Sequence, residues 1–219
     1  MAVLNNQSPE ESPGERKDGL RQWFGPSRKE VWRLLAQGIG GTYVDGGFWR
    51  GDKVAVQAGE WTVTLDTHIV SAGKSSTTYT RMRAPYVNAD GFRFTIYRRS
   101  IFSGLGKAMG MQDIEIGDPS FDEAFIVKAN DQAKVRRLLG NGRIRQLLTA
   151  QPDVLFEVKD DEGWFATHFP EGVDELCFLS LGVLKDLDLL EAMYALFAET
   201  LEELCRIGSA YEDDPQVKL

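Results

Sequence analysis

The chain has 219 residues, 42% of them hydrophobic, and a formal net charge of −8, which is typical of a globular protein that buries a core without disulfide support. The acidic balance argues against general nucleic-acid binding, which needs a basic surface to displace counterions. No run approaches the ~20 apolar residues of a membrane helix, and the first residues lack an apolar signal segment. Both cysteines, Cys177 and Cys205, lie in apolar segments. We therefore expect a reducing, cytoplasmic location.

The first structured element is predicted just after a polar beginning. Residues 1–24 are rich in Asn, Ser, Pro, Glu and Gly, a composition that predicts a mobile tail. Ser27 and Glu30 have the spacing of a capping box. The helical stripe that follows consists of Val31, Trp32, Leu34 and Leu35, and glycines at 38, 40 and 41 end it. The sequence thus predicts an N-terminal helix.

Alternating patterns then predict strands over 52–58, 60–69, 76–83 and 91–99. The clearest is 60–69, where one predicted core face carries Trp61, Val63, Leu65, Thr67 and Ile69. Ala58-Gly59 is a turn signal between the first two strands. We expect the last two strands to pair through a turn at 84–91, which would continue an antiparallel meander.

The second half alternates between short strands and helices. Strands are predicted over 113–116, 123–128 and 175–183, and a hairpin over 154–159 and 163–168. Asn130 is the predicted cap of a helix over 131–139, which Gly140-Asn141-Gly142 separates from a second helix over 143–150. The longest helical stripe runs over 187–207 and contains Leu190, Met193, Tyr194, Phe197, Leu201, Leu204 and Cys205.

These elements predict an α+β fold with a mainly antiparallel sheet, an N-terminal helix, a broken central helix and a long C-terminal amphipathic helix. A single domain over 25–209 is expected, with two sub-regions that could meet near residue 100. Residues 210–219 are predicted to fray.

One segment carries a recognisable pattern, Asp-Pro-x-Phe-Asp-x-x-Phe-x-Val, followed by a polar pair and a helix with two leucines. The residues are Asp118, Pro119, Phe121, Asp122, Phe125, Val127, Asn130, Asp131, Leu138 and Leu139. The pattern resembles an uncharacterised bacterial family of unknown function. The resemblance implies a bacterial protein and transfers no activity.

Cofactor and metal motifs are incomplete. Gly73-Lys74-Ser75 lacks both the upstream glycine and the following helix of a phosphate-binding loop, so a hairpin turn is expected. Glycines 104, 106 and 110 do not have dinucleotide-loop spacing. The two cysteines and two histidines are scattered, which argues against a zinc site. An acidic cluster (Asp113, Glu115, Asp118, Asp122 and Glu123) fits no calcium loop, so Asp118-Pro119 is interpreted as a turn. We expect no metal and no cofactor.

A basic face is the one specific candidate site. If strands 76–83 and 91–99 pair, they place six side chains on one surface: Tyr79, Arg81, Arg83, Arg93, Tyr97 and Arg99. Guanidinium groups suit phosphates and carboxylates. The alternative is that these arginines pair with acids on the neighbouring strand, Glu60 or Asp66.

Three functions remain open. The first is a non-enzymatic binding or interaction module. The second is an enzyme for an anionic or phosphorylated small molecule, with the arginines as a clamp and His68 or an acid as the base. The third is a subunit that self-associates through the C-terminal helix or an exposed edge strand, so a homo-oligomer is possible.

Overall fold

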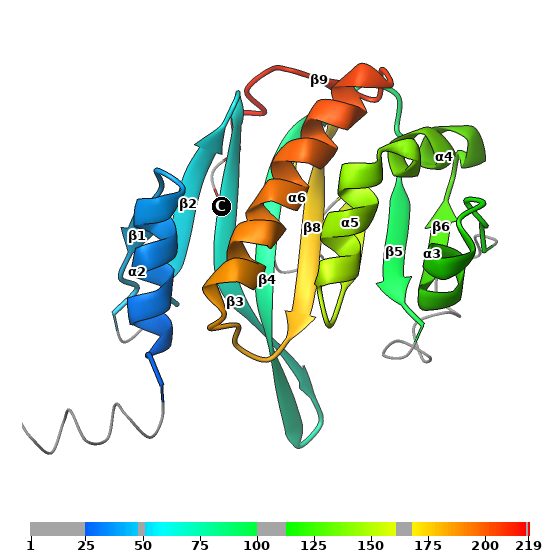
Figure 1. Ribbon diagram of the computed structural model, residues 1–219. Coiled ribbons are helices and arrows are strands. Elements are labelled where there is room, and N and C mark those ends of the chain that lie inside the picture. Colours follow the sequence, from blue (N-terminus) through cyan, green and yellow to red (C-terminus); the bar gives the residue numbers. More distant parts are fainter. Residues whose placement is uncertain (1–24, 48–50, 100–112, 161–167, 218) are drawn as a thin grey trace, which may run out of the picture.

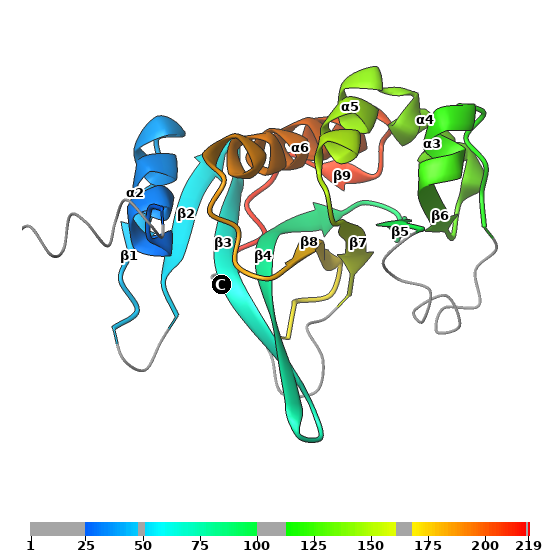
Figure 2. The same ribbon diagram turned by 60° about the horizontal axis from the view of Figure 1, so that its bottom comes forward.

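A computed structural model describes residues 25–47, 51–99, 113–160, 168–217 and 219 of the chain. Nine strands form one sheet in the order β1-β2-β3-β4-β8-β7-β5-β6, with β9 beside β4. Every pair of these strands is antiparallel. The helices lie over one face of the sheet, as Figures 1 and 2 show. The predicted α+β fold with a mainly antiparallel sheet is confirmed, whereas the predicted tail over 1–24 lies outside the described residues.

The bounds of the elements are as follows. The strands are β1 (Thr42–Val44), β2 (Lys53–Ala58), β3 (Trp61–Ala72), β4 (Ser75–Asn88), β5 (Phe94–Arg98), β6 (Phe125–Ala129), β7 (Leu155–Lys159), β8 (Val173–Leu181) and β9 (Ala210–Tyr211). The helices are α2 (Arg28–Gly38), α3 (Pro119–Ala124), α4 (Gln132–Gly140), α5 (Gly142–Ala150) and α6 (Leu187–Arg206).

The core lies between the sheet and the long helix α6. Phe197 of α6 is fully buried, and its ring meets the Phe156 ring of β7 at 5.7 Å in an edge-to-face arrangement. Phe156 also contacts Phe94 of β5 and Phe178 of β8. The amphipathic stripe of the sequence thus packs against the central strands, as predicted. At the other end of the helical layer, the capping box of Ser27 and Glu30 is present at the start of α2.

The predicted pairing of strands 76–83 and 91–99 is wrong. β4 does not turn at residue 84 but continues through Pro85 to Asn88, and it pairs with β8. β5 pairs with β6 and β7 instead, so two strands separate it from β4. The alternation of buried Met82, Ala84 and Tyr86 continues past the proline, and this burial outweighs the local turn signal.

The region around residue 118 also differs from its prediction. Residues 113–116 form no strand beyond a single bridge between Asp113 and Lys128. The helix α3 precedes β6, and its N-cap is Asp118, whose carboxylate accepts the Phe121 N–H. The cap of α4 is Asp131 rather than Asn130. Asn130 instead binds the backbone before β5.

The end of the chain is more ordered than predicted. Ala210 and Tyr211 form β9 and pair with Asn88 and Val87 of β4, so the chain does not fray from residue 210. The Lys53 ammonium donates to the carbonyl of Leu219 at 2.9 Å. Within the described part of the chain, no helix is both long and apolar enough to cross a membrane.

Candidate functional site

The six residues of the predicted basic face do not converge. Strand registers connect Arg81 to Leu179, then to Leu155 and then to Tyr97. Paired residues point to the same side of a sheet, so Arg81 and Tyr97 share a face. Three strand spacings separate them, however, or roughly 14 Å. The residues therefore form separate groups on β4, on β5 and beside it.

Arg81 and Arg83 of β4 form an ion-pair cluster with acidic residues of the neighbouring strands. Arg81 holds the Asp66 carboxylate with two bonds, Nε to Oδ1 at 2.8 Å and Nη2 to Oδ2 at 2.9 Å. Arg83 Nη2 donates to the same Oδ2 at 2.6 Å, and its Nη1 lies 3.8 Å from Glu175 Oε2. Asp66 lies opposite Arg81 on β3. The alternative expectation, an ion pair with Asp66 on the neighbouring strand, is confirmed for Arg81 and Arg83 but not for Arg93, which pairs with Asp174 and Asp160.

Glu175 is the buried end of this cluster. It is 1% exposed, and its Oε2 accepts no hydrogen bond from the described residues. Burial raises the pKa of Glu175 to about 7. Burial likewise raises the pKa of the nearby Cys177 thiol to about 12, which disfavours the thiolate form that a nucleophilic cysteine needs.

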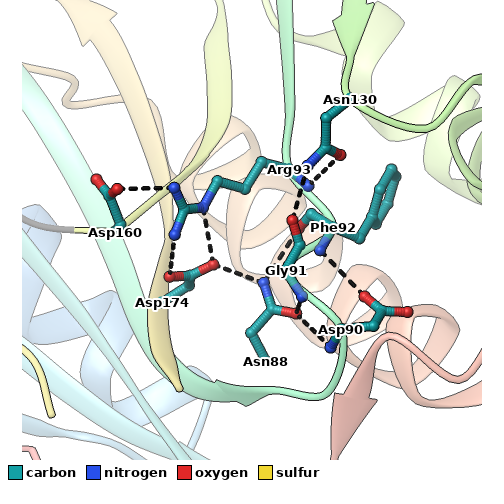
Figure 3. Close-up of polar contacts among 8 residues, drawn as sticks. All are labelled: Asn88, Asp90, Gly91, Phe92, Arg93, Asn130, Asp160 and Asp174. Carbon is teal, nitrogen blue, oxygen red and sulfur yellow. Dashed lines mark hydrogen bonds and ion pairs between the residues drawn. The ribbon is translucent and has the colours of Figure 1, made fainter. Parts of the chain in front are cut away.

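Arg93 belongs to a second network, at the crossing from β4 to β5 (Figure 3). Its guanidinium donates to both oxygens of Asp174 at 3.1 Å and to Asp160 at 2.7 Å. Asn88 Nδ2 donates to Asp174 at 2.5 Å. The hydrogen bond to Asp174 is the main reason why the pKa of Arg93 is raised. The positive charge of Arg93 is thus balanced by the carboxylates of Asp174 and Asp160.

The backbone of the crossing is fixed by the same residues. Asn130 Oδ1 accepts the Arg93 N–H at 2.9 Å, and its Nδ2 donates to the Gly91 carbonyl at 2.7 Å (Figure 3). Asn88 Oδ1 accepts the N–H groups of Asp90 and Gly91. These bonds satisfy the backbone of an irregular connection, so the network is architectural.

The remaining candidates occupy different surroundings. Tyr97 is buried, and Tyr79 is half-buried opposite His68. Arg99 is exposed and donates to the Asp122 carbonyl at 3.3 Å. It borders a polar pocket of about 390 Å³ whose ionic lining is Arg99, Asp113, Glu115, Asp122 and Arg136. Three carboxylates against two guanidinium groups do not favour an anionic ligand there.

Two members of the acidic cluster, Asp118 and Asp122, accept backbone N–H groups. Asp122 accepts the N–H groups of Ile116 and Gly117 at 2.9 and 3.0 Å, and Asp118 caps α3. Among the residues with described positions, no group of three or more His, Cys, Asp or Glu side chains is arranged to hold a metal ion. Asp118-Pro119 thus begins the helix α3 instead of forming the predicted turn, although Asp118 does accept a local backbone N–H, that of Phe121, as the prediction expected.

A different feature, the β3–β4 ribbon (residues 66–80), has the most unusual surface. β2 pairs with β3 only as far as Leu65, and β8 pairs with β4 only from Tyr79 onward. Farther out, the two strands pair with each other up to Ala72 and Ser75, and Gly73 makes the turn with a φ of +62°. Figures 1 and 2 show this hairpin projecting beyond the rest of the sheet.

The ribbon exposes apolar side chains and carries little charge. Ile69 is 61% exposed and Val70 44%, and Leu181 of the adjoining β8 is 50% exposed. Lys74 is the only residue with a formal charge between Thr67 and Thr80 in the sequence. The prediction that Ile69 lies on the core face is wrong because the strand continues beyond the helical layer. The signal available in the sequence was the shortage of charges in two adjacent strands.

Comparisons with known proteins give little further guidance. No family model matches the chain, and no curated protein matches it. The resemblance to an uncharacterised bacterial family therefore stays a prediction. A solved structure that matches is the mycobacterial trehalose monomycolate transport factor A, TtfA, with 10% identity and a TM-score of 0.47. The match covers 82% of this chain and 95% of that one, and similarity at this level says nothing about activity or partners.

Proposed function

We propose that the protein is a non-enzymatic interaction module that binds another polypeptide by strand addition at the β3–β4 ribbon. The observation that carries the proposal is a projecting pair of strands with exposed apolar side chains, in which β3 over 66–72 pairs with no described strand other than β4. In strand addition, backbone hydrogen bonds supply affinity and alternate side chains supply specificity.

The lack of protection at this edge is the physical argument. Proteins usually guard an exposed strand with charges, proline, bulges or a covering element. The stretch between Thr67 and Thr80 contains no proline and a single charge, at Lys74. A two-stranded ribbon is also marginally stable by itself in water. A partner strand would satisfy its outer backbone groups and cover Ile69 and Val70.

The enzyme alternative has less support. Arg81, Arg83 and Arg93 are engaged by carboxylates of the chain itself. Burial, followed by the charge of Arg81, lowers the pKa of His68, which lies beside the ion-pair cluster rather than facing a free anion clamp. Both cysteines are free thiols, in keeping with the proposed cytoplasmic location.

Photocrosslinking in the producing cells tests the proposal. A photoreactive phenylalanine analogue at Val70 is expected to give discrete protein adducts. The matched control is the same analogue at Tyr211, which is 54% exposed on the short strand β9. Adducts at Val70 that are no more abundant than those at Tyr211 would contradict strand addition at the ribbon.

A further inference from the structure

We infer that the partner strand is the ribbon of a second copy of this chain, with the two β3 edges paired antiparallel across a two-fold axis. The inference rests on the proposed function and names the partner.

The orientation of β3 follows from a single hydrogen bond. The Gly182 N–H donates to the Thr78 carbonyl at 2.8 Å, so the backbone groups of Thr78 point away from β3. Thr78 lies opposite Ile69. In an antiparallel pair, such opposite residues belong to a non-hydrogen-bonded position, and both point their N–H and C=O groups outward. Ile69, and by alternation Ser71, therefore present their backbone groups at the outer edge of β3.

This edge is complementary to itself. A two-fold axis at Ile69 or at Val70 places outward-pointing residues opposite outward-pointing residues of the other copy, as a hydrogen-bonded antiparallel ladder requires. With the axis at Val70, Ile69 meets the partner's Ser71, and Ser71 meets the partner's Ile69. The two Val70 side chains then face each other on one side of the new sheet, where apolar pairs stabilise neighbouring strands. An isologous contact of this kind closes at a dimer.

Charge favours the ribbon as the place where two copies meet. Each copy carries a net charge of −8, so close approach of most surfaces brings like charges together. The ribbon has a single formal charge, Lys74, between Thr67 and Thr80. It also projects away from the helical layer (Figure 2). Two copies can therefore join here while their acidic bodies stay apart.

The two ends of the sheet are less suitable. β1 is only three residues long. Beside β6, the segment after residue 112 already bonds to the strand, since the Ile114 N–H donates to the Val127 carbonyl at 2.8 Å and Asp113 bridges Lys128. Among the described residues, the outer part of β3 is thus longer than β1 and, unlike β6, has no further segment bonded along its edge.

Sedimentation velocity of the purified full chain tests the inference. Between about 1 µM and 1 mM, the range of weak protein association, the wild type is expected to shift from monomer to dimer. In the Ile69→Lys variant, the new ammonium group would lie opposite the same group of the other copy if the axis is at Ile69, or against the uncharged edge of the other copy if the axis is at Val70. We therefore expect dimerisation to weaken at least about tenfold. Tyr211→Glu, the matched exposed control, should leave the dimer unchanged.

Ser71→Pro is a second variant with a specific readout. It removes an outward N–H that the dimer ladder uses and no bond within the ribbon. Its thermal melt should match that of the wild type at low concentration, while dimerisation is lost. A wild type that stays monomeric up to 1 mM, or a dimer that persists in both ribbon variants, would overturn the inference. Adducts of Val70 with other proteins would then leave strand addition standing, whereas the absence of adducts would end both proposals.

Discussion

The inner and outer parts of the same two strands have opposite surroundings. In the inner part, Trp61 and Leu65 of β3 are 3% and 2% exposed beneath the helical layer. In the outer part, Ile69 and Val70 are 61% and 44% exposed, although the strand continues without interruption. Cross-strand pairing alone is thus enough to extend a ribbon, whereas the burial of its side chains depends on the elements that cover them. A surface that retains apolar residues without cover is a candidate for contact with a partner.

The largest expected effect separates the covered core from the ribbon. Phe197→Ala should cost about 3–5 kcal/mol of unfolding free energy, because it leaves a cavity against Phe156. Ile69→Ala should change stability by less than about 0.5 kcal/mol at a concentration where the protein is monomeric. Urea unfolding of both variants measures the difference. Equal losses would mean that Ile69 is part of the core.

A second contrast concerns buried and exposed ion pairs. Arg83→Gln should cost roughly 3 kcal/mol, because it removes the cation beside the buried Glu175 and one of the two guanidinium groups that hold Asp66. The control is Arg33→Gln, which removes an exposed pair with Asp45 at 3.6 Å and should have no measurable effect. Urea unfolding at pH 7 compares the two variants. A small effect at Arg83 would show that solvent screens the cluster.

Glu175 should give the cluster a specific pH dependence. Its folded-state pKa of about 7 lies above the ordinary value of 4.5, so the folded state binds the proton more tightly than the unfolded state. Its contribution is complete below about pH 4.5 and is lost as the pH rises through about 7. Glu175→Gln should therefore fall less in stability between pH 5 and pH 8 than the wild type. Identical profiles in thermal melts would contradict the raised pKa.

The smallest expected effect is at Asp118. Its carboxylate accepts the Phe121 N–H and the Ser120 hydroxyl, which lower its pKa. Because the carboxylate already has these partners, millimolar calcium or magnesium should not raise the melting temperature. A metal-dependent rise that Asp118→Ala abolishes would show that Asp118 binds a metal ion in addition to capping α3.

Local patterns predicted much of the fold. The capping box at Ser27, the helical stripe of α6 and the alternation from Trp61 to Leu65 each report interactions that are close in sequence. Turn chemistry predicted the hairpin at Gly73, which the positive φ there confirms. In each case the residues that decide the structure are neighbours in the sequence.

Long-range pairing could not be predicted in this way. Ala84-Pro85 is typical of a turn, yet β8, about 90 residues later in the chain, pairs with this segment and keeps it extended. Two acids on β8 were missed for the same reason, Asp174 beside Arg93 and Glu175 beside Arg83. Asp174 and Glu175 stand at the start of an apolar strand, and a charged pair inside a buried run was the signal that each needed a cation.

Amide hydrogen exchange along β3, resolved by residue, tests the central claim most directly. In dilute protein, the outward N–H groups of Ile69 and Ser71 should exchange rapidly, while those of His68 and Val70, which point toward β4, should be protected. At high concentration all four should be protected, because a partner strand then occupies the outer edge. Rapid exchange of Ile69 and Ser71 at every concentration would contradict pairing between copies at this ribbon.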